Sequence, residues 1–405
     1  MLLMRRDTSS REQRKRFGER LAEYRKAAHV SQQRIADELG LARTTVVAIE
    51  AGQREMSAEE LVKTAAVLNI EVSDLVRQAP PLENMFVELR ADQEDVELLP
   101  VLVEFRRLVE DYLALEDLLG MPLPRREPAP YDVYSKNIDA SAVDIAVQER
   151  DRLALRDGPV ADLIGTLETD VGMRIFHLPL PSRLAGFYAY NERSGACIAI
   201  NTNHPTGRQA LTLAHEYGHF LTRRHHQEVT RVGGYTRVPA RERFANEFAL
   251  EFLMPRMGLR RRLRDLVAHR NSDVTVADLV RLKDYYHVSF EAMMLRLESI
   301  GILKSGTYTN LREQGFRVSD AERSLDIKVN QTPMLPSRYE HLAVLAFFNE
   351  AVSEYEFARL LRRPRLEARS VANRYREDVE VQDNGVIATR DVDISKAIEI
   401  TVGAT

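Results

Sequence analysis

The first part of the chain carries apolar side chains at the spacing of short amphipathic helices. Between residues 17 and 77 they recur every three to four positions, which places them on one face of a helix. The predicted helices span residues 17–28, 31–39, 42–50 and 57–68, followed by a last turn at 73–76. Pro80 and Pro81 end the pattern, because consecutive prolines cannot continue a helix. We therefore expect residues 1–79 to form a compact all-α domain.

A longer helical pattern follows over residues 82–119, in which Leu98, Leu102 and Phe105 begin the apolar repeat. The proline-rich segment 121–130 then predicts a stiff extended linker. We interpret residues 80–138 as a helical linker that is either a spacer or a dimerisation element.

The remaining chain mixes helical and β-like patterns. Helices are predicted at 142–155 and 159–171, and short β-like runs at 174–178, 186–190 and 196–201. Residues 139–300 are therefore predicted to form an α+β domain with a small sheet. Helices at 339–349 and 353–361 and a β-like run at 379–388 predict a small C-terminal α+β domain of unknown function over 301–405. The predicted fold class is a multi-domain, mainly α protein.

Length and composition agree with several soluble folding units. A chain of 405 residues exceeds what one hydrophobic core usually holds, and 44% hydrophobic with 29% charged residues is typical of globular proteins. No stretch reaches the roughly 18 uncharged apolar residues of a membrane helix, and the basic start MLLMRRDTSS lacks a secretory signal pattern. We expect a cytoplasmic protein with no membrane partner. Cys197 is the only cysteine, so histidines and carboxylates would have to hold any metal.

Charge is unevenly distributed, although the formal net charge is only −4. Ten Lys or Arg residues stand against four Asp or Glu residues between Arg5 and Arg34. Such a basic segment attracts a phosphate backbone. Taken alone, it is equally typical of a solvated helix face.

Residues 31–50 have the pattern of two helices joined by a tight turn. Ser31 is placed to cap the first helix, and Gly40 permits the turn. Val46 and Ile49 bury the second helix, which leaves its start exposed. The residues expected there to read base edges of a DNA operator are Arg43, Thr44, Thr45 and Val47. Those expected to grip phosphate groups are Gln32, Arg34 and Arg54.

Across residues 17–77 the chain resembles the Cro/repressor-like, XRE-type helix-turn-helix family. The resemblance implies DNA binding, and because such domains usually work in pairs we favour a homodimer. The alternative is a helical interaction domain that touches no DNA. An antitoxin-like partner protein is a third hypothesis for the whole chain, and only the helix-turn-helix pattern supports it.

The stretch LTLAHEYGHFL carries an H-E-x-x-H pattern at His215, Glu216 and His219. Residues four apart lie on one face of a helix, so both imidazoles can bind one Zn²⁺. Glu216 lies beside them and is suited to take a proton from metal-bound water. Thr206 and Gln209 fit a capping box that would fix the start of this helix.

A third ligand is expected on the next helix, in the stretch ARERFANEFALEFLMP. Glu242 shares its face with the small or polar residues Ala245, Asn246 and Ala249. Small residues let this helix pack closely against the metal helix, with the carboxylate pointing across. Glu247 is the competing candidate, but its face turns away from the small residues, so Glu242 is favoured.

The A-H-E-x-G-H pattern, then E-x-x-A-N-x-F-A ending in L-M-P, resembles the ImmA/IrrE family of zinc metallopeptidases over residues 140–300. The resemblance implies zinc on His215, His219 and Glu242, water at the fourth position, and Glu216 as general base. Family members cleave helix-turn-helix repressors or are required for that cleavage, which implies such a repressor, or the chain itself, as substrate. Two departures leave the substrate open. The helix-turn-helix region is fused to the peptidase region, and residues 301–405 lie outside the resemblance.

These patterns predict a DNA-binding transcriptional regulator with zinc-dependent endopeptidase activity that relieves repression in a stress or DNA-damage response. The runner-up hypothesis is a DNA-binding transcription factor whose metallopeptidase fold senses a ligand without proteolysis. The intact Glu216 favours the enzyme, because a pure sensor would not need that carboxylate.

Two further features have competing interpretations. A Cys197 thiolate near zinc could fill the open coordination position and regulate the enzyme, although a small buried hydrophobe is favoured. If residues 196–201 form a sheet edge, a substrate could pair with them as an added strand. A basic helical run could bind single-stranded DNA as a damage signal, although a solvated face is favoured: Arg256, Arg260, Arg261, Arg262 and Arg264.

Overall fold

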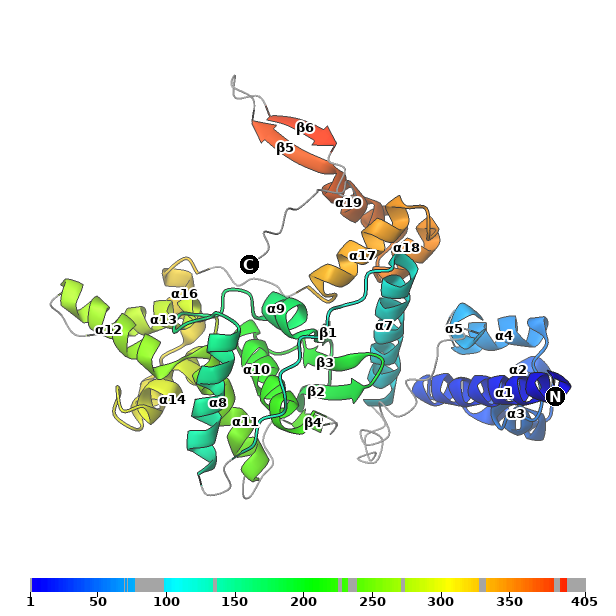
Figure 1. Cartoon of the computed structure of the whole chain (residues 1–405), viewed down its shortest axis with the longest axis horizontal. Coiled ribbons are helices and arrows are strands. Elements are labelled where there is room, and N and C mark those ends of the chain that lie inside the picture. Colours follow the sequence, from blue (N-terminus) through cyan, green and yellow to red (C-terminus); the bar gives the residue numbers. More distant parts are fainter. Residues whose placement is uncertain are drawn as a thin grey trace.

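The structure is a computed structural model, and it describes residues 2–68, 70, 72–76, 98–133, 137–224, 228–231, 239–270, 274–327, 333–381 and 387–391. A small helical bundle stands at one end of the molecule, and a larger mixed region holds a sheet between layers of helices (Figure 1). No helix within these described ranges is long and apolar enough to cross a membrane.

The N-terminal bundle contains α1 (Leu2–Ala27), α2 (Gln32–Leu39), α3 (Arg43–Glu50), α4 (Ala58–Leu68) and α5 (Val72–Val76). As predicted, Ile35, Val46 and Ile49 are fully buried in its core. The Ser31 hydroxyl accepts a hydrogen bond from the Arg34 backbone N–H at 3.0 Å, which caps α2. Gly40 has the left-handed φ of 65° that the turn to α3 requires.

Helix α1 begins much earlier than residue 17, where the apolar pattern placed its start. The added turns contain five arginines, which favour helix without adding an apolar repeat. Farther along, Glu23 of α1 accepts a hydrogen bond from Arg106 of α7 (Leu98–Leu119) at 2.6 Å. Both side chains are largely buried, so this ion pair docks the bundle on α7.

The sheet contains β1 (Arg174–Leu178), β2 (Leu184–Asn191), β3 (Gly195–Asn201) and β4 (Glu228–Arg231), in the order β1-β3-β2-β4. β1 pairs with β3 in parallel, and the other pairings are antiparallel. β3 is therefore a central strand and not a sheet edge, so the condition under which a substrate could pair with residues 196–201 is not met. Every residue of β3 is buried, as expected for a strand covered on both faces.

One face of the sheet is covered by α8 (Ile138–Arg152), α10 (Thr206–Arg223) and α11 (Ala240–Leu253) (Figure 1). Ile198 and Ile200 of β3 belong to the core on this side. Between α8 and β1, the predicted helix 159–171 is divided into α9 (Leu163–Thr166) and a π-helical turn over Leu167–Val171.

The same core continues away from the sheet. It includes side chains of α12 (Arg256–Arg270), α13 (Val276–Tyr285) and α14 (Phe290–Ser299), and α15 (Thr307–Glu313) and α16 (Val318–Ser324) pack against it. Chain beyond residue 300 therefore extends this core.

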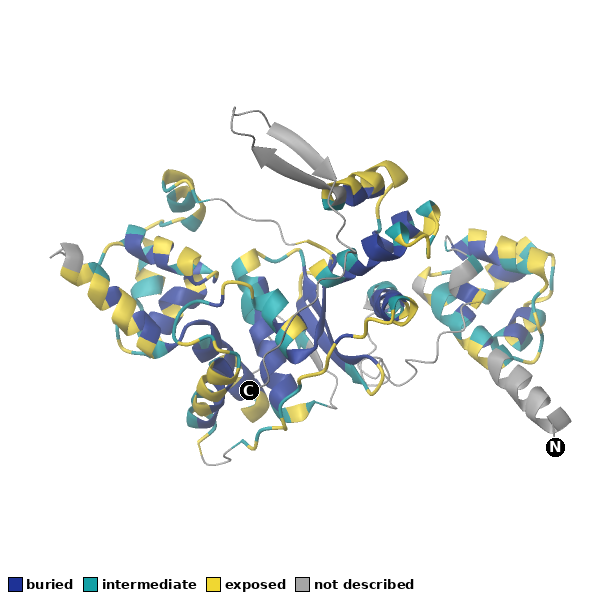
Figure 2. Ribbon diagram, turned by 45° about the horizontal axis from the view of Figure 1, so that its top comes forward, coloured by how far each residue is buried: buried dark blue, intermediate teal, exposed yellow. Residues whose placement is uncertain are grey.

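The opposite face of the sheet is covered by α7, α17 (Ser337–Phe348), α18 (Glu354–Leu360) and α19 (Arg365–Arg376). Phe105 and Tyr112 of α7 meet Phe176 of β1 edge to face, with ring centroids 5.7 and 6.2 Å apart. Figure 2 shows buried residues on both sides of the sheet. The apolar face of α7 that suggested a dimerisation element packs within the chain, and the homodimer stays a prediction.

At the end of the described chain, β5 (Glu377–Val381) and β6 (Ile387–Asp391) pair antiparallel in a ribbon of their own. The single β-like run predicted over 379–388 spans parts of both strands and residues 382–386, which lie outside the described residues. The domain boundaries at residues 79, 138 and 300 remain predictions.

Candidate metal centre

Helix α10 positions two histidines four residues apart. Its N-cap is Pro205, which makes no side-chain cap, and the Gln209 side chain donates instead to the His204 carbonyl oxygen at 2.7 Å. The predicted capping box of Thr206 and Gln209 is therefore wrong, because Thr206 is already the first helical residue. The helix nevertheless starts where the sequence indicated.

Three side chains converge between α10 and α11. The Nε2 atoms of His215 and His219 lie 3.0 Å apart. Glu242 of α11 places Oε2 3.5 Å from His215 Nε2 and Oε1 3.6 Å from His219 Nε2. Each of these three residues is at most 6% exposed. The competing Glu247 points elsewhere, since its Oε1 accepts a hydrogen bond from Arg296 at 3.0 Å.

Small residues let the two helices approach, as the sequence indicated. A Cβ added at Gly218 would lie 3.0 Å from Phe248 Cδ1 and 3.3 Å from Ala245 Cα. Ala245 and Ala249 are fully buried at this contact. The short separation brings Glu242 across to the histidines of α10.

The donor set fits a zinc ion. His215 Nδ1 lies 2.9 Å from Asn246 Oδ1, and since an amide oxygen only accepts, Nδ1 carries the proton and Nε2 keeps its lone pair. Burial lowers the pKa of His219 to about 3, so this imidazole is neutral, as a metal ligand must be. Burial acts in the same direction on His215, but Glu242 and Glu216 outweigh it and its pKa is raised. Two imidazoles and one carboxylate are a common zinc ligand set with room for water.

Glu216 lies beside this cluster and is fully buried. Its Oε1 accepts a hydrogen bond from the Thr230 hydroxyl of β4 at 2.5 Å, while Oε2 has no hydrogen-bond partner among the described residues. Burial raises the pKa of Glu216 to about 7, a value suited to a group that takes and returns a proton near neutrality. Thr230 was not recognised from the sequence, because four residues of strand give too short a pattern.

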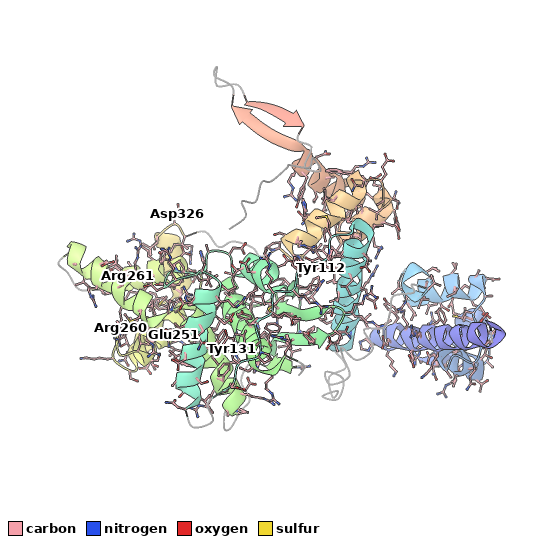
Figure 3. All side chains as sticks on the ribbon, in the orientation of Figure 1. Tyr112, Tyr131, Glu251, Arg260, Arg261 and Asp326 are labelled. Atoms are coloured by element: carbon pink, nitrogen blue, oxygen red, sulfur yellow. The ribbon has the colours of Figure 1, made fainter. Side chains whose placement is uncertain are left out.

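A second set of contacts holds α10 in place. Tyr217 of α10 donates to the buried carboxylate of Glu149 on α8, which also accepts from Tyr131 at 2.7 Å and from Arg152 at 2.8 Å. Tyr131, labelled in Figure 3, belongs to the extended linker, and its backbone N–H bonds the Leu221 carbonyl oxygen at 2.9 Å. The segment after α7 therefore helps to hold α10 in place.

Two parts of the chain match known protein families. Residues 168–298 match the IrrE N-terminal-like domain, and residues 21–75 match the helix-turn-helix family. The chain joins an XRE-type helix-turn-helix domain to an IrrE-like peptidase domain. The helix-turn-helix part is 33% identical over 92 residues to the cryptic phage CTXphi transcriptional repressor RstR of Vibrio cholerae serotype O1, covering 21% of this chain and 82% of RstR.

A solved structure, ComR from Streptococcus suis, is 14% identical and is covered over 93% of its length by 89% of this chain. The TM-score is 0.15, a value too low to indicate a shared overall arrangement.

In the IrrE-like domain, Cys197 lies on the wrong face of the sheet to reach the histidines. Its side chain is in the core formed with α7, whereas its neighbour Ile198 faces α10. The proposed regulatory contact with zinc is therefore excluded by the alternation of side chains along a strand. Burial raises the pKa of the Cys197 thiol to about 11, so the favoured interpretation as a small buried hydrophobe is supported.

In the helix-turn-helix domain, Arg34, Arg43 and Thr44 are exposed, Thr45 is half-buried and Val47 is 43% exposed. Two of the residues predicted to contact phosphate also make hydrogen bonds within the domain, and their contact with phosphate stays a prediction. Gln32 donates to Glu50 at 2.8 Å, and Arg54 donates to Glu60 at 2.8 Å. Glu50 also accepts a hydrogen bond from Arg25 at 2.6 Å, so it holds both Arg25 and Gln32. This role of Glu50 was not recognised from the sequence.

The basic run on α12 is also partly engaged in the IrrE-like domain. Arg256 bonds Glu251 at 3.1 Å, Arg261 bonds Asp157 at 2.5 Å, and Arg260 donates to the Ile300 carbonyl oxygen at 3.1 Å. Figure 3 labels Arg260 and Arg261 on this helix. Binding of single-stranded DNA by the run remains a prediction.

Proposed function

We propose that this chain is a DNA-binding regulator with zinc-dependent endopeptidase activity, which hydrolyses a peptide bond in a helix-turn-helix repressor, or in itself, to relieve repression. The observation that carries the proposal is the buried convergence of His215, His219 and Glu242 beside Glu216. A stress or DNA-damage response is the setting that the family resemblance favours.

In this proposal His215, His219 and Glu242 would hold the zinc ion. A bound zinc ion would polarise the scissile carbonyl group and lower the pKa of water. Asn246 orients the His215 ring through Nδ1. Thr230 occupies Oε1 of Glu216, which leaves Oε2 as the oxygen that accepts the proton and later returns it to the leaving amine.

DNA binding is assigned to the start of α3. Arg43, Thr44 and Val47 are exposed there, while the buried side of α3 fixes their direction. The similarity to a phage repressor supports operator binding, and the usual pairing of such domains supports a homodimer. If Arg43 reads a base, Arg43→Ala should weaken operator binding by about 1–3 kcal/mol and affect random DNA less. Equal weakening on both DNAs, measured by titration at one salt concentration, would make it a phosphate contact.

The second candidate function is a ligand sensor without proteolysis. The feature that favours it is the closure of the site, since Glu216 is fully buried and the histidines are at most 5% exposed. A protein substrate needs that site to open, whereas a sensor does not.

One pair of variants separates the two functions. Glu216→Gln keeps the size of the side chain and leaves the three ligands in place, so we expect about one zinc per chain by elemental analysis. His219→Ala should lose most of the metal. General-base contributions are typically about 10²- to 10⁴-fold, so Glu216→Gln should abolish repressor cleavage in cells. If Glu216→Gln relieves repression like the wild type while His219→Ala fails, the metal is structural or sensory and the peptidase proposal is wrong.

A further inference from the structure

A cavity separate from the histidine cluster lies at the N-terminal end of α10. It has a volume of about 630 Å³ and is bounded by the starts of α10 and α14, the segment before α9, and α16. Figure 1 shows α9, α10, α13 and α16 in this part of the molecule, and Asp326, labelled in Figure 3, follows α16 in the chain. Small-molecule pockets usually measure about 300–1,000 Å³. None of its lining residues belongs to the group formed by His215, Glu216, His219 and Glu242.

The walls of this cavity are largely apolar. Val160 and Leu213 are buried core residues, and Ile164, Tyr308 and Ile327 are half-buried around the opening. Such a lining favours an apolar molecule, because covering apolar surface removes it from water.

Two buried polar side chains also line the cavity. His177 of β1 is 3% exposed. Burial lowers the pKa of His177 to about 4, so the ring is neutral. Gln209 is 7% exposed, and with its amide nitrogen engaged by the His204 carbonyl, its oxygen Oε1 lacks a donor among the described residues. An unpaired buried acceptor is costly, and a ligand that donates a hydrogen bond removes that cost.

The charges around the opening select against an anion. Four carboxylates line it, and the only ammonium among the described lining residues is Lys283. Lys283 is itself held by Glu322 at 2.5 Å. The opening is therefore net negative, and a ligand with its own carboxylate or phosphate would be repelled there.

We propose that this cavity binds a small, largely apolar molecule that is neutral or cationic and carries one hydrogen-bond donor, a hydroxyl or an amine. The donor group meets Gln209 and His177, and the apolar body lies against Leu213 and the residues around the opening. Because Gln209 and Leu213 lie on α10, which also carries His215, a ligand bound in the cavity restrains the start of α10. The site requires no proteolysis and goes beyond the proposed peptidase.

Three probes with one skeleton test the assignment: 4-phenylbutan-1-ol, 4-phenylbutylamine and 4-phenylbutanoate. Binding to the full chain is measured by calorimetry and ligand-observed NMR. We expect the alcohol and the amine to bind at least about tenfold more tightly than the carboxylate, a difference of about 1.4 kcal/mol. Failure of all three probes to bind, or equal binding of the carboxylate, would overturn the proposal.

Variants locate the binding. Ala210→Phe extends a ring from α10 into the cavity and should weaken the alcohol and amine at least about tenfold. Ala140→Leu on α8 is the matched control, because Ala140 is also half-buried but does not line the cavity, and binding should be unchanged. Gln209→Leu should weaken the alcohol and amine while leaving the carboxylate unaffected, with far-UV circular dichroism verifying the fold. Undiminished alcohol binding by both Ala210→Phe and Gln209→Leu would place the ligand elsewhere and refute the site.

Discussion

Two arginines bind the same buried carboxylate, and they should contribute very differently to stability. Glu251 of α11 is 2% exposed, and both Arg296 and Arg256 contact it. Arg296 is 1% exposed and also donates to Glu247 at 3.0 Å and to the Met254 carbonyl oxygen at 3.3 Å. Arg256 has 41% of its side chain exposed, and its backbone N–H bonds Glu251 at 3.0 Å whatever its side chain.

Replacing Arg296 with Met leaves Glu251 buried with one partly solvated partner and leaves a carbonyl oxygen without its donor. Breaking a buried pair in this way costs about 3–5 kcal/mol, and because Arg256 remains we expect the lower end, about 3 kcal/mol. Arg256→Met is the matched control, and it should cost about 0–1 kcal/mol, as exposed ion pairs do.

Urea unfolding followed by far-UV circular dichroism measures both changes, since the chain has no tryptophan to report by fluorescence. The buried variant should shift the midpoint strongly, and the control hardly at all. Equal shifts for the two variants would refute the reasoning that burial, and not the number of ion pairs, determines how much each arginine contributes to the free energy of unfolding.

Two other substitutions or treatments test the packing around the centre. Gly218→Ala should destabilise the domain by about 1 kcal/mol and reduce metal retention. Overpacking against Phe248 costs about 1–3 kcal/mol, and the better helix propensity of Ala offsets about 1 kcal/mol of that cost. An increase in the urea midpoint would contradict this prediction. Cys197 should resist a thiol reagent such as DTNB in the folded protein and react only in urea, because it is buried with a pKa of about 11; fast native-state labelling would show that the sheet face opens.

Local patterns predicted much of the architecture. The helices around Ser31 and Gly40, the runs at 174–178 and 196–201, and the buried group on α10 follow from periodicity and capping. These features depend on residues near one another in the chain, whose spacing is visible in the sequence. The position of Glu242 beside the histidines could also be predicted, because small residues on α11 indicated a close helix contact.

Strand order and the partners of α7 depend on residues far apart in the sequence. The face on which Cys197 lies and the place of residues 196–201 in the sheet were left open by the sequence, because only the parallel pairing of β1 with β3 makes β3 a central strand. Thr230 escaped notice because β4 has no apolar alternation of its own and is recognised only by its pairing with β2. The intradomain partners of Gln32 and Arg54 likewise depend on how helices dock.

The central strand β3 separates two hydrophobic cores and contributes side chains to both. Its odd and even side chains enter opposite cores, one built with the histidine-bearing helix and the other with α7. A displacement of the β3 backbone toward either side therefore moves side chains in both cores, because the two sets of side chains are attached to the same backbone. Through the Arg106–Glu23 pair, α7 also contacts the helical bundle that contains α3. The core around the histidine-bearing helix and the helix-turn-helix domain are therefore joined through one strand and one helix.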